Sequence, residues 1–220
     1  MRQNKQNSIT TVIGKKGSGK STLAEIISVC DDKPKIIIDP RMQFHSDVKR
    51  RVIFRNVEKL KLTLLDIDKF KEFYNRRLEI VLHTDDETEV EKLFEFVYRY
   101  MQKITLVIDE VDMFCNAYTQ NSSYIYKLIN FARHKEINII TTSRRPANIS
   151  RSLTANTDTF YFARISEPND LDYANKILNK EVIEAIGNLE KFEFIKYTEE
   201  TNESVKLKTT LNNIEIIDSL

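Results

Sequence analysis

Short apolar segments alternate with amphipathic segments along most of the chain. Residues 104–108, Ile-Thr-Leu-Val-Ile, are almost continuously apolar, as is typical of a strand buried on both faces of a parallel sheet. In residues 86–102 the apolar side chains recur at helical spacing instead, which predicts an amphipathic helix. The same criteria predict strands at 8–13, 35–39, 51–55, 78–83, 104–108, 137–142 and 158–163. They predict helices at 20–29, 86–102, about 121–134, near 149–154 and about 168–179, with a further helix around 66–76 in the less regular segment 57–77.

Strands that alternate with helices favour an α/β domain with a mostly parallel central sheet flanked by helices. The last 30 residues differ, because apolar and polar positions alternate there without a helical segment, which predicts a C-terminal antiparallel β-hairpin with Asn202 near its turn. No interdomain linker separates the two parts. We therefore expect one domain over residues 1–220, with a core at about 8–180 and a C-terminal extension at about 190–220.

Composition changes this picture little. The chain has 220 residues, 41% of them hydrophobic, and a net charge of +1, so overall charge neither indicates nor excludes nucleic acid. A DNA-binding surface would have to be a local patch; Lys49-Arg50-Arg51 and Arg76-Arg77 are candidates, although such clusters are more often ordinary surface. Two cysteines and the lack of a signal-like or membrane-length apolar segment favour a soluble cytoplasmic protein without a membrane segment.

The glycine-rich segment between the first predicted strand and helix carries the strongest chemical signal. Its sequence, Gly14-Lys15-Lys16-Gly17-Ser18-Gly19-Lys20-Ser21, fits the phosphate-binding pattern Gly-x4-Gly-Lys-Ser. Glycines allow a tight turn whose backbone N–H groups point at phosphates, and the following helix adds the positive end of its dipole. Lys20 is expected to reach the β- and γ-phosphates and Ser21 to ligate Mg²⁺, with Thr22 as its neighbour. The sequence thus predicts a P-loop nucleotide triphosphatase.

An acidic pair, Asp109-Glu110, directly follows the apolar run at 104–108. An acid at the carboxyl end of a buried parallel strand faces the ligand crevice. We expect Asp109 to support the Mg²⁺ and Glu110 to orient or deprotonate the attacking water. Asp112 extends the pair to Asp-Glu-Val-Asp, and we interpret it as structural.

Hydroxyl and guanidinium groups follow the predicted strand at 137–142. Ser143 is a candidate sensor of the γ-phosphate at the same crevice. Arg133, Arg144, Arg145 and Arg151 are candidates for stabilising transition-state charge, because guanidinium is planar, multidentate and always charged. For each arginine taken singly, a surface ion pair is the more common role.

Two other functional classes remain open at this point. A small-molecule kinase, acting on a nucleoside or nucleotide, would use mobile arginines, but a water-activating Glu110 is unwanted in a transferase. A GTPase would carry an Asn-Lys-x-Asp guanine box, whereas Asn175-Lys176 and Asn179-Lys180 lack the final aspartate, which favours ATP. The histidines, His45, His83 and His134, show no metal-ligand spacing with the cysteines, so no metal beyond the nucleotide's Mg²⁺ is expected.

The later segments resemble a known group of ATPases. Residues 133–146 are Arg-His-Lys-Glu-Ile-Asn-Ile-Ile-Thr-Thr-Ser-Arg-Arg-Pro, and Ile149-Ser150, Asn156-Thr157 and Glu167-Pro168-Asn169-Asp170 follow. Their order is similar to that in HerA/FtsK-type P-loop ATPases, most of all the small viral genome-packaging members, over about residues 8–180.

The resemblance implies a RecA-like (ASCE) P-loop NTPase fold and a homo-oligomeric ring, a pentamer or hexamer, that hydrolyses ATP with Mg²⁺ and translocates double-stranded DNA. It implies genome packaging at a capsid portal or vertex, in the host cytoplasm or virion. Carried over by position, Lys20, Ser21, Asp109 and Glu110 are its catalytic and metal-binding residues, and Arg133 is the first choice for a finger acting between subunits. The group often has glutamine where this chain has Arg144, so Arg144 or Ser143 is expected to replace that sensor.

Overall fold

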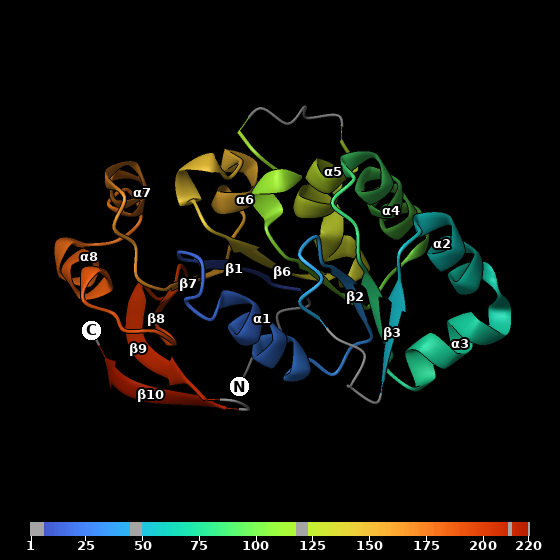
Figure 1. Cartoon of the computed structure of the whole chain (residues 1–220), viewed down its shortest axis with the longest axis horizontal. Helices are drawn as coiled ribbons and strands as arrows, with labels where there is room; N and C mark the ends of the chain where they lie inside the picture. Colours follow the sequence, from blue (N-terminus) through green and yellow to red (C-terminus); the bar gives the residue numbers. More distant parts are fainter. Residues whose placement is uncertain (1–6, 45–49, 118–122, 211–212, 220) are drawn as a thin grey trace.

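The computed structural model describes residues 7–44, 50–117, 123–210 and 213–219, and within them one sheet of ten strands runs through the molecule (Figure 1). Seven strands are mutually parallel, in the order β7-β1-β6-β5-β2-β4-β3. They are β1 (Ile9–Ile13), β2 (Lys35–Ile38), β3 (Arg51–Phe54), β4 (Glu79–Leu82), β5 (Thr105–Ile108), β6 (Asn138–Ser143) and β7 (Thr159–Phe162). The predicted parallel α/β sheet is confirmed, and each strand lies within one or two residues of its predicted bounds.

Helices cover both faces of this sheet (Figure 1). One face carries α1 (Lys20–Val29), and the other carries α2 (Val57–Leu65), α4 (Glu87–Tyr100), α5 (Tyr124–Phe131) and α6 (Arg151–Ala155). The remaining helices are α3 (Ile67–Asn75), α7 (Pro168–Ala174) and α8 (Lys180–Gly187).

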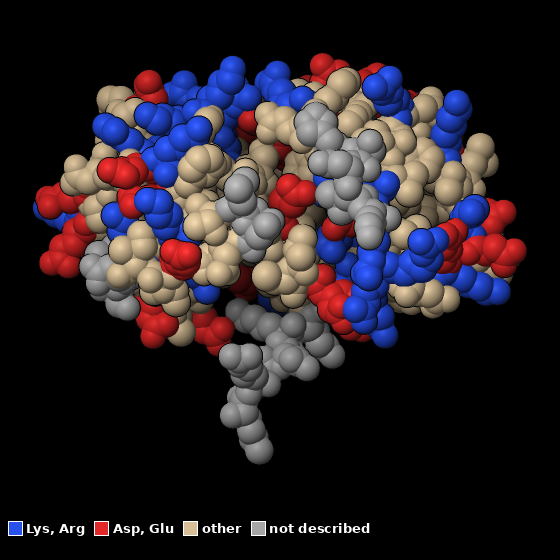
Figure 2. Space-filling view, turned by 60° about the horizontal axis from the view of Figure 1, so that its bottom comes forward, with Lys and Arg blue, Asp and Glu red and all other residues tan. Residues whose placement is uncertain are grey.

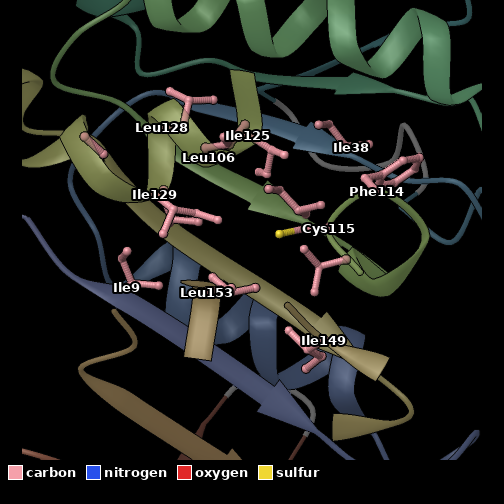
Figure 3. Close-up of a cluster of buried hydrophobic side chains, with 14 of the residues drawn as sticks. Ile9, Ile38, Leu106, Phe114, Cys115, Ile125, Leu128, Ile129, Ile149 and Leu153 are labelled. Carbon is pink, nitrogen blue, oxygen red and sulfur yellow. The ribbon is translucent and has the colours of Figure 1, made fainter. Parts of the chain in front are cut away.

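Alternate side chains of the strands supply the two layers of the core. In β2, Ile36 and Ile38 belong to the large cluster under α2, α4 and α5, whereas Ile37 packs with Ala24 of α1. Figure 3 shows the large cluster between the sheet and α5, with Leu128 and Cys115 among its labelled members. Each fully buried isoleucine or leucine contributes roughly 1.5–3 kcal/mol relative to an exposed one, so this pattern fixes which strand face meets which helix.

Side-chain caps divide the helical segments more finely than the hydrophobic pattern predicts. Residues 57–77 contain two helices, because Asn56 caps α2 and the Asp66 side chain accepts hydrogen bonds at the start of α3. The helix predicted at 168–179 is shorter and separate from α8, which Asn179 caps. The helix predicted at 121–134 is α5 followed by a 3₁₀ turn, Ala132–Lys135; residues 121 and 122 lie outside the described residues.

The C-terminal extension continues the central sheet. Strands β8 (Glu193–Thr198) and β9 (Glu203–Thr209) form the predicted antiparallel hairpin, and Asn202 precedes β9 with a left-handed φ of 53°. A further strand, β10 (Ile214–Ser219), pairs with β9, and β8 pairs antiparallel with β7. The hairpin therefore belongs to the same sheet as the phosphate-loop strand. Among the described residues, no helix is long and apolar enough to cross a membrane.

Candidate nucleotide-binding site

The glycine-rich segment forms a turn from the carboxyl end of β1 into α1, and its glycines are required by the geometry. The Gly14 N–H donates to the Ser143 carbonyl at 3.1 Å, and a Cβ at Gly14 would lie 2.6 Å from the Ala163 Cβ. Gly17 and Gly19 have φ angles of 79° and 99°, which side chains rarely adopt. This turn brings successive backbone N–H groups together at the carboxyl edge of the sheet, as phosphate binding requires.

Helix α1 begins at Lys20, directly after this turn. Its N-cap residue is Gly19, so no side chain caps its first N–H groups, which suits an anionic ligand. The Lys20 side chain lies in the crevice, 6% exposed, and its Nζ donates to the Lys15 carbonyl at 3.2 Å. Burial lowers the pKa of Lys20, while the charges of Glu110 and Asp109 oppose this effect. Lys15 and Lys16 point into solvent.

Asp109 joins three elements of the site. Its Oδ1 accepts a hydrogen bond from Ser21 Oγ at 3.1 Å and another from Thr142 Oγ1 at 2.7 Å. Its Oδ2 is buried and has no hydrogen-bond partner among the described residues. Burial raises the pKa of Asp109, and the charges of Glu110 and Asp39 act in the same direction. A hydroxyl and a carboxylate so placed beside the phosphate loop are oxygen ligands that fit Mg²⁺.

Glu110 sits beside Asp109 in an uncommon backbone conformation. Its φ is 50°, in the left-handed region, and its N–H donates to Thr142 Oγ1 at 3.0 Å. Arg144 Nε donates to Glu110 Oε1 at 2.7 Å. Strained backbone of this kind persists where the surrounding contacts hold it, often at functional sites. Thr142 and Arg144 therefore position Glu110 from the backbone and the side chain respectively.

The candidate sensor and the third acid of the sequence contact each other. Ser143 is fully buried, and its Oγ donates to Asp112 Oδ1 at 2.9 Å. The Ser143 carbonyl also accepts the Gly14 N–H. Ser143 thus joins β6 to the phosphate loop, and Asp112 has a structural contact.

The candidate arginines lie in different places, and Arg144 is the one that contacts Glu110. Arg145 Nε pairs with Asp170 Oδ2 at 3.4 Å. Arg133 is exposed in the 3₁₀ turn before β6, at the amino ends of the parallel strands, whereas the phosphate loop lies at their carboxyl ends. Arg151 lines a separate hollow of about 950 Å³ that α6, α7 and β8 help to enclose.

The proposed DNA-contact clusters are held mainly in ion pairs. We expected residues 49–51 to be a candidate surface patch for DNA, but Arg51 is not on the surface. Its side chain is 3% exposed and pairs with both Glu79 and Glu25. Arg76 pairs with Glu72 and Arg77 with Asp32. Lys49 and His45 lie outside the described residues. Within the part of the chain that the structure covers, histidine, cysteine and acidic side chains form no group of three or more suited to a metal.

Phe192 is a residue of this site that the sequence did not predict. Its N–H donates to the Ser18 carbonyl at 3.1 Å, and a Cβ at Gly19 would lie 2.4 Å from its Cδ1. It has a φ of 68°, which is unusual for a bulky side chain. The extension thus contacts the phosphate loop directly. No local motif marks Phe192, because the contact arises only when β8 joins the sheet beside β7.

Comparison with known proteins establishes the fold. No protein-family model matches the sequence, and no curated protein matches it. The genome packaging NTPase B204 from Sulfolobus turreted icosahedral virus 2, in complex with ATP-gammaS, has a similar structure, with a TM-score of 0.70, 19% identity and coverage of 97% of each chain. VirB4 of Thermoanaerobacter pseudethanolicus has a TM-score of 0.61 at 12% identity, covering 100% of this chain and 91% of that one. The RadB recombinase has a TM-score of 0.52 at 14% identity, covering 96% of this chain and 91% of that one. The chain thus resembles a viral packaging ATPase in fold over its whole length.

Proposed function

We propose that this protein is an ATP-hydrolysing ring motor that translocates double-stranded DNA, as in viral genome packaging. The observation that carries the proposal is the pair of hydrogen bonds that Ser21 and Thr142 donate to Asp109. These bonds lie beside the glycine-rich phosphate loop, and Glu110 follows Asp109 in the sequence. This arrangement combines phosphate binding, a magnesium site and a carboxylate for water activation. Its likeness in fold to B204, which is described as a DNA-packaging ATPase, supports the same assignment.

The residues divide into binding and catalytic roles. The backbone of residues 14–19 and the Lys20 ammonium bind the phosphates, with Ser21 and Thr22 at the start of α1. Ser21 and Asp109 fit Mg²⁺, which when bound supplies charge neutralisation at the phosphates. Glu110 orients and deprotonates the attacking water. Arg144 holds Glu110 and takes the place of a glutamine sensor at the end of β6.

A homo-oligomeric ring accounts for the position of Arg133. This arginine lies at the edge of the sheet opposite its own phosphate loop, so it acts on the site of a neighbouring subunit. A pentamer or hexamer with a finger acting between subunits places one arginine at each interface. A planar guanidinium at that interface stabilises the charge that develops during hydrolysis.

Double-stranded DNA is the proposed polymer substrate and a capsid portal or vertex the proposed docking site. Because the net charge is only +1, DNA contacts must come from a local patch. Figure 2 shows acidic and basic side chains interspersed over the visible face, with basic side chains denser along its upper left edge. The proposed place of action is the host cytoplasm or the virion.

Hydrolysis is favoured over phosphoryl transfer to a small molecule by the position of Glu110. Glu110 is 6% exposed and lies beside Asp109 at the crevice, where water activation is expected. A kinase for a nucleoside or nucleotide would instead have to exclude water from this place.

The proposal is tested by ATP hydrolysis with and without duplex DNA, together with particle mass in the presence of ATP. We expect DNA to stimulate hydrolysis and ATP to favour a ring. Glu110→Gln should bind ATP normally and lose hydrolysis by at least 100-fold, because a general base typically contributes roughly 10²–10⁴-fold. The matched control is Glu87→Gln, an exposed glutamate at the start of α4, which should behave as wild type.

Two results would contradict the proposal. If duplex DNA neither binds the assembled particle nor changes the hydrolysis rate, the translocation role is wrong. If the protein transfers the γ-phosphate to a nucleoside or nucleotide instead of water, the kinase alternative replaces it.

A further inference from the structure

Four polar residues form a row across adjacent strands at the carboxyl edge of the sheet. They are Thr142, the next-to-last residue of β6, and Asp109, Asp39 and His83, which directly follow β5, β2 and β4. The pairing Ile38↔Ile108 puts Asp39 beside Asp109, and Ile38↔Leu82 puts it beside His83. The ladder continues through these positions, since the Asp109 N–H donates to the Ile38 carbonyl and the Asp39 N–H to the Leu82 carbonyl.

Asp39 and Asp109 also point to the same face of the sheet. Ile37 and Val107, two residues earlier in each strand, both pack with Ala24 of α1. Side chains two residues apart share a face, so both carboxylates project towards α1 and its phosphate loop. Adjacent strands lie about 4.8 Å apart, which makes the two carboxylates immediate neighbours. Consistently, the charge of Asp39 contributes to raising the pKa of Asp109.

The hydrogen bonds of the row leave one buried oxygen of each central carboxylate without a partner among the described residues. Asp39 Oδ2 accepts the Phe44 N–H at 2.8 Å and lies 3.1 Å from His83 Nε2. Asp109 Oδ1 accepts from Thr142 and Ser21. Asp39 Oδ1 and Asp109 Oδ2 are both buried, and neither has a hydrogen-bond partner among the described residues. One oxygen of each of the two central carboxylates is thus held by protein contacts, and the other is available to accept a hydrogen bond from a ligand.

Two buried neighbouring carboxylates repel each other and are costly to desolvate unless a cation or donors lie between them. Asp39 is 0% exposed, so bulk water does not relieve this cost. The His83 ring and the Phe44 N–H hold Asp39 in place, and His83 follows β4, on the side of β2 away from β1. The arrangement therefore fits a shared ligand that carries positive charge or donates hydrogen bonds to both free oxygens.

We infer that Asp39 is a second acidic residue of the magnesium site, which accepts hydrogen bonds from the hydration shell of the nucleotide-bound ion. This inference rests on the proposed function, because Mg²⁺ enters with ATP. His83 is a positioning residue that acts through Asp39. The sequence contained the signal: Asp39 follows the apolar run Ile36–Ile38 just as Asp109 follows its own.

The test compares the affinity for ATPγS in Mg²⁺ and in EDTA, measured by calorimetry. Asp39→Asn should bind ATPγS about 10-fold more weakly in Mg²⁺, the lower end of the range for partners that support metal ligands. In EDTA its affinity should be unchanged or higher, because a negative charge near the phosphates is removed. Manganese resonance titration of the ADP complex should show the same loss in Mn²⁺ affinity. Asp170→Asn, a buried carboxylate that pairs with Arg145, is the matched control and should leave the Mg²⁺-to-EDTA ratio unchanged.

If Asp39→Asn leaves the ratio of ATPγS affinity in Mg²⁺ to that in EDTA unchanged, the inference is overturned. An equal loss of ATPγS affinity in both media gives this result and would show a structural role only. If Asp39→Asn does not fold, His83→Gln replaces it; a lowered ratio supports the inference and an unchanged one overturns it. Failure of the proposed function is distinguishable, because it appears in the DNA and hydrolysis assays, whereas this inference is judged only by the Mg²⁺-to-EDTA affinity ratio of the variant relative to wild type.

Discussion

The contact between Gly19 and Phe192 gives the most quantitative prediction. Substituting Gly19→Ala places a side chain at φ 99°, and strain in the left-handed region costs roughly 1–2 kcal/mol. The new Cβ also lies 2.4 Å from Cδ1 and 2.9 Å from Cε1 of Phe192. Relief of such overpacking costs about 1–3 kcal/mol. The free energy of unfolding should therefore fall by about 2–5 kcal/mol, the sum of these two ranges.

The backbone of Phe192 is held on both sides, so relief of the contact requires the ring itself to turn or the loop to shift. Its N–H donates to Ser18, and its carbonyl accepts the Thr209 N–H at 2.9 Å. Removing the ring should isolate the steric part of the cost. In a Phe192→Ala background, Gly19→Ala should lower the free energy of unfolding by only the strain, roughly 1–2 kcal/mol. The coupling energy of the double-mutant cycle should then be about 1–3 kcal/mol.

The assay is guanidinium unfolding of the four proteins, with ATPγS affinity as a second readout. Gly19→Ala should weaken ATPγS binding, and the double variant should recover part of the loss, since its loop is no longer displaced. If Gly19→Ala costs the same free energy in both backgrounds, the ring of Phe192 does not press on the loop. The inferred steric contact between this ring and residue 19 would then be wrong.

Three further predictions concern the same site and the core. Arg144→Ala should release Glu110 from its hydrogen bond without disrupting ATP binding, and it should lower the rate of hydrolysis more than 10-fold. Steady-state kinetics measure this rate, with ATPγS affinity as the control. An unchanged rate would exclude Arg144 as the sensor. Thr142→Val keeps the shape of the side chain but removes the hydroxyl that donates to Asp109 and accepts the Glu110 N–H. Denaturant titrations should therefore show a free energy of unfolding that is lower by about 1–3 kcal/mol or more. Burial raises the pKa of the Cys115 thiol to about 12 from 9.0. The unfolded thiol ionises first, so its contribution to stability is complete below about pH 9 and is lost as the pH rises towards 12. Cys115→Ser should flatten this alkaline decline in pH-dependent unfolding, and an identical slope would contradict the assignment.

The sequence alone determined the elements whose signals are local. Buried parallel strands are rich in apolar and β-branched residues, so the strands from Ile9 to Phe162 could be placed within one or two residues. The glycine-rich turn between β1 and α1 was equally predictable, because its glycines, Lys20 and Ser21 lie close together in the chain. Asp109 and Glu110 followed from the rule that ligands bind at the carboxyl ends of parallel strands.

Tertiary structure alone decided the contacts between segments far apart in the chain. The split of residues 57–77 into two helices is instead a local effect of the caps at Asn56 and Asp66, which the hydrophobic pattern alone does not reveal. The order of strands brought Asp39 beside Asp109 and Arg144 onto Glu110, while Arg133 was left at the opposite edge. Apolar periodicity states which face of a strand is buried but not which strand lies next to it. Strand order is set by the packing of the whole sheet, and that order assembles the site.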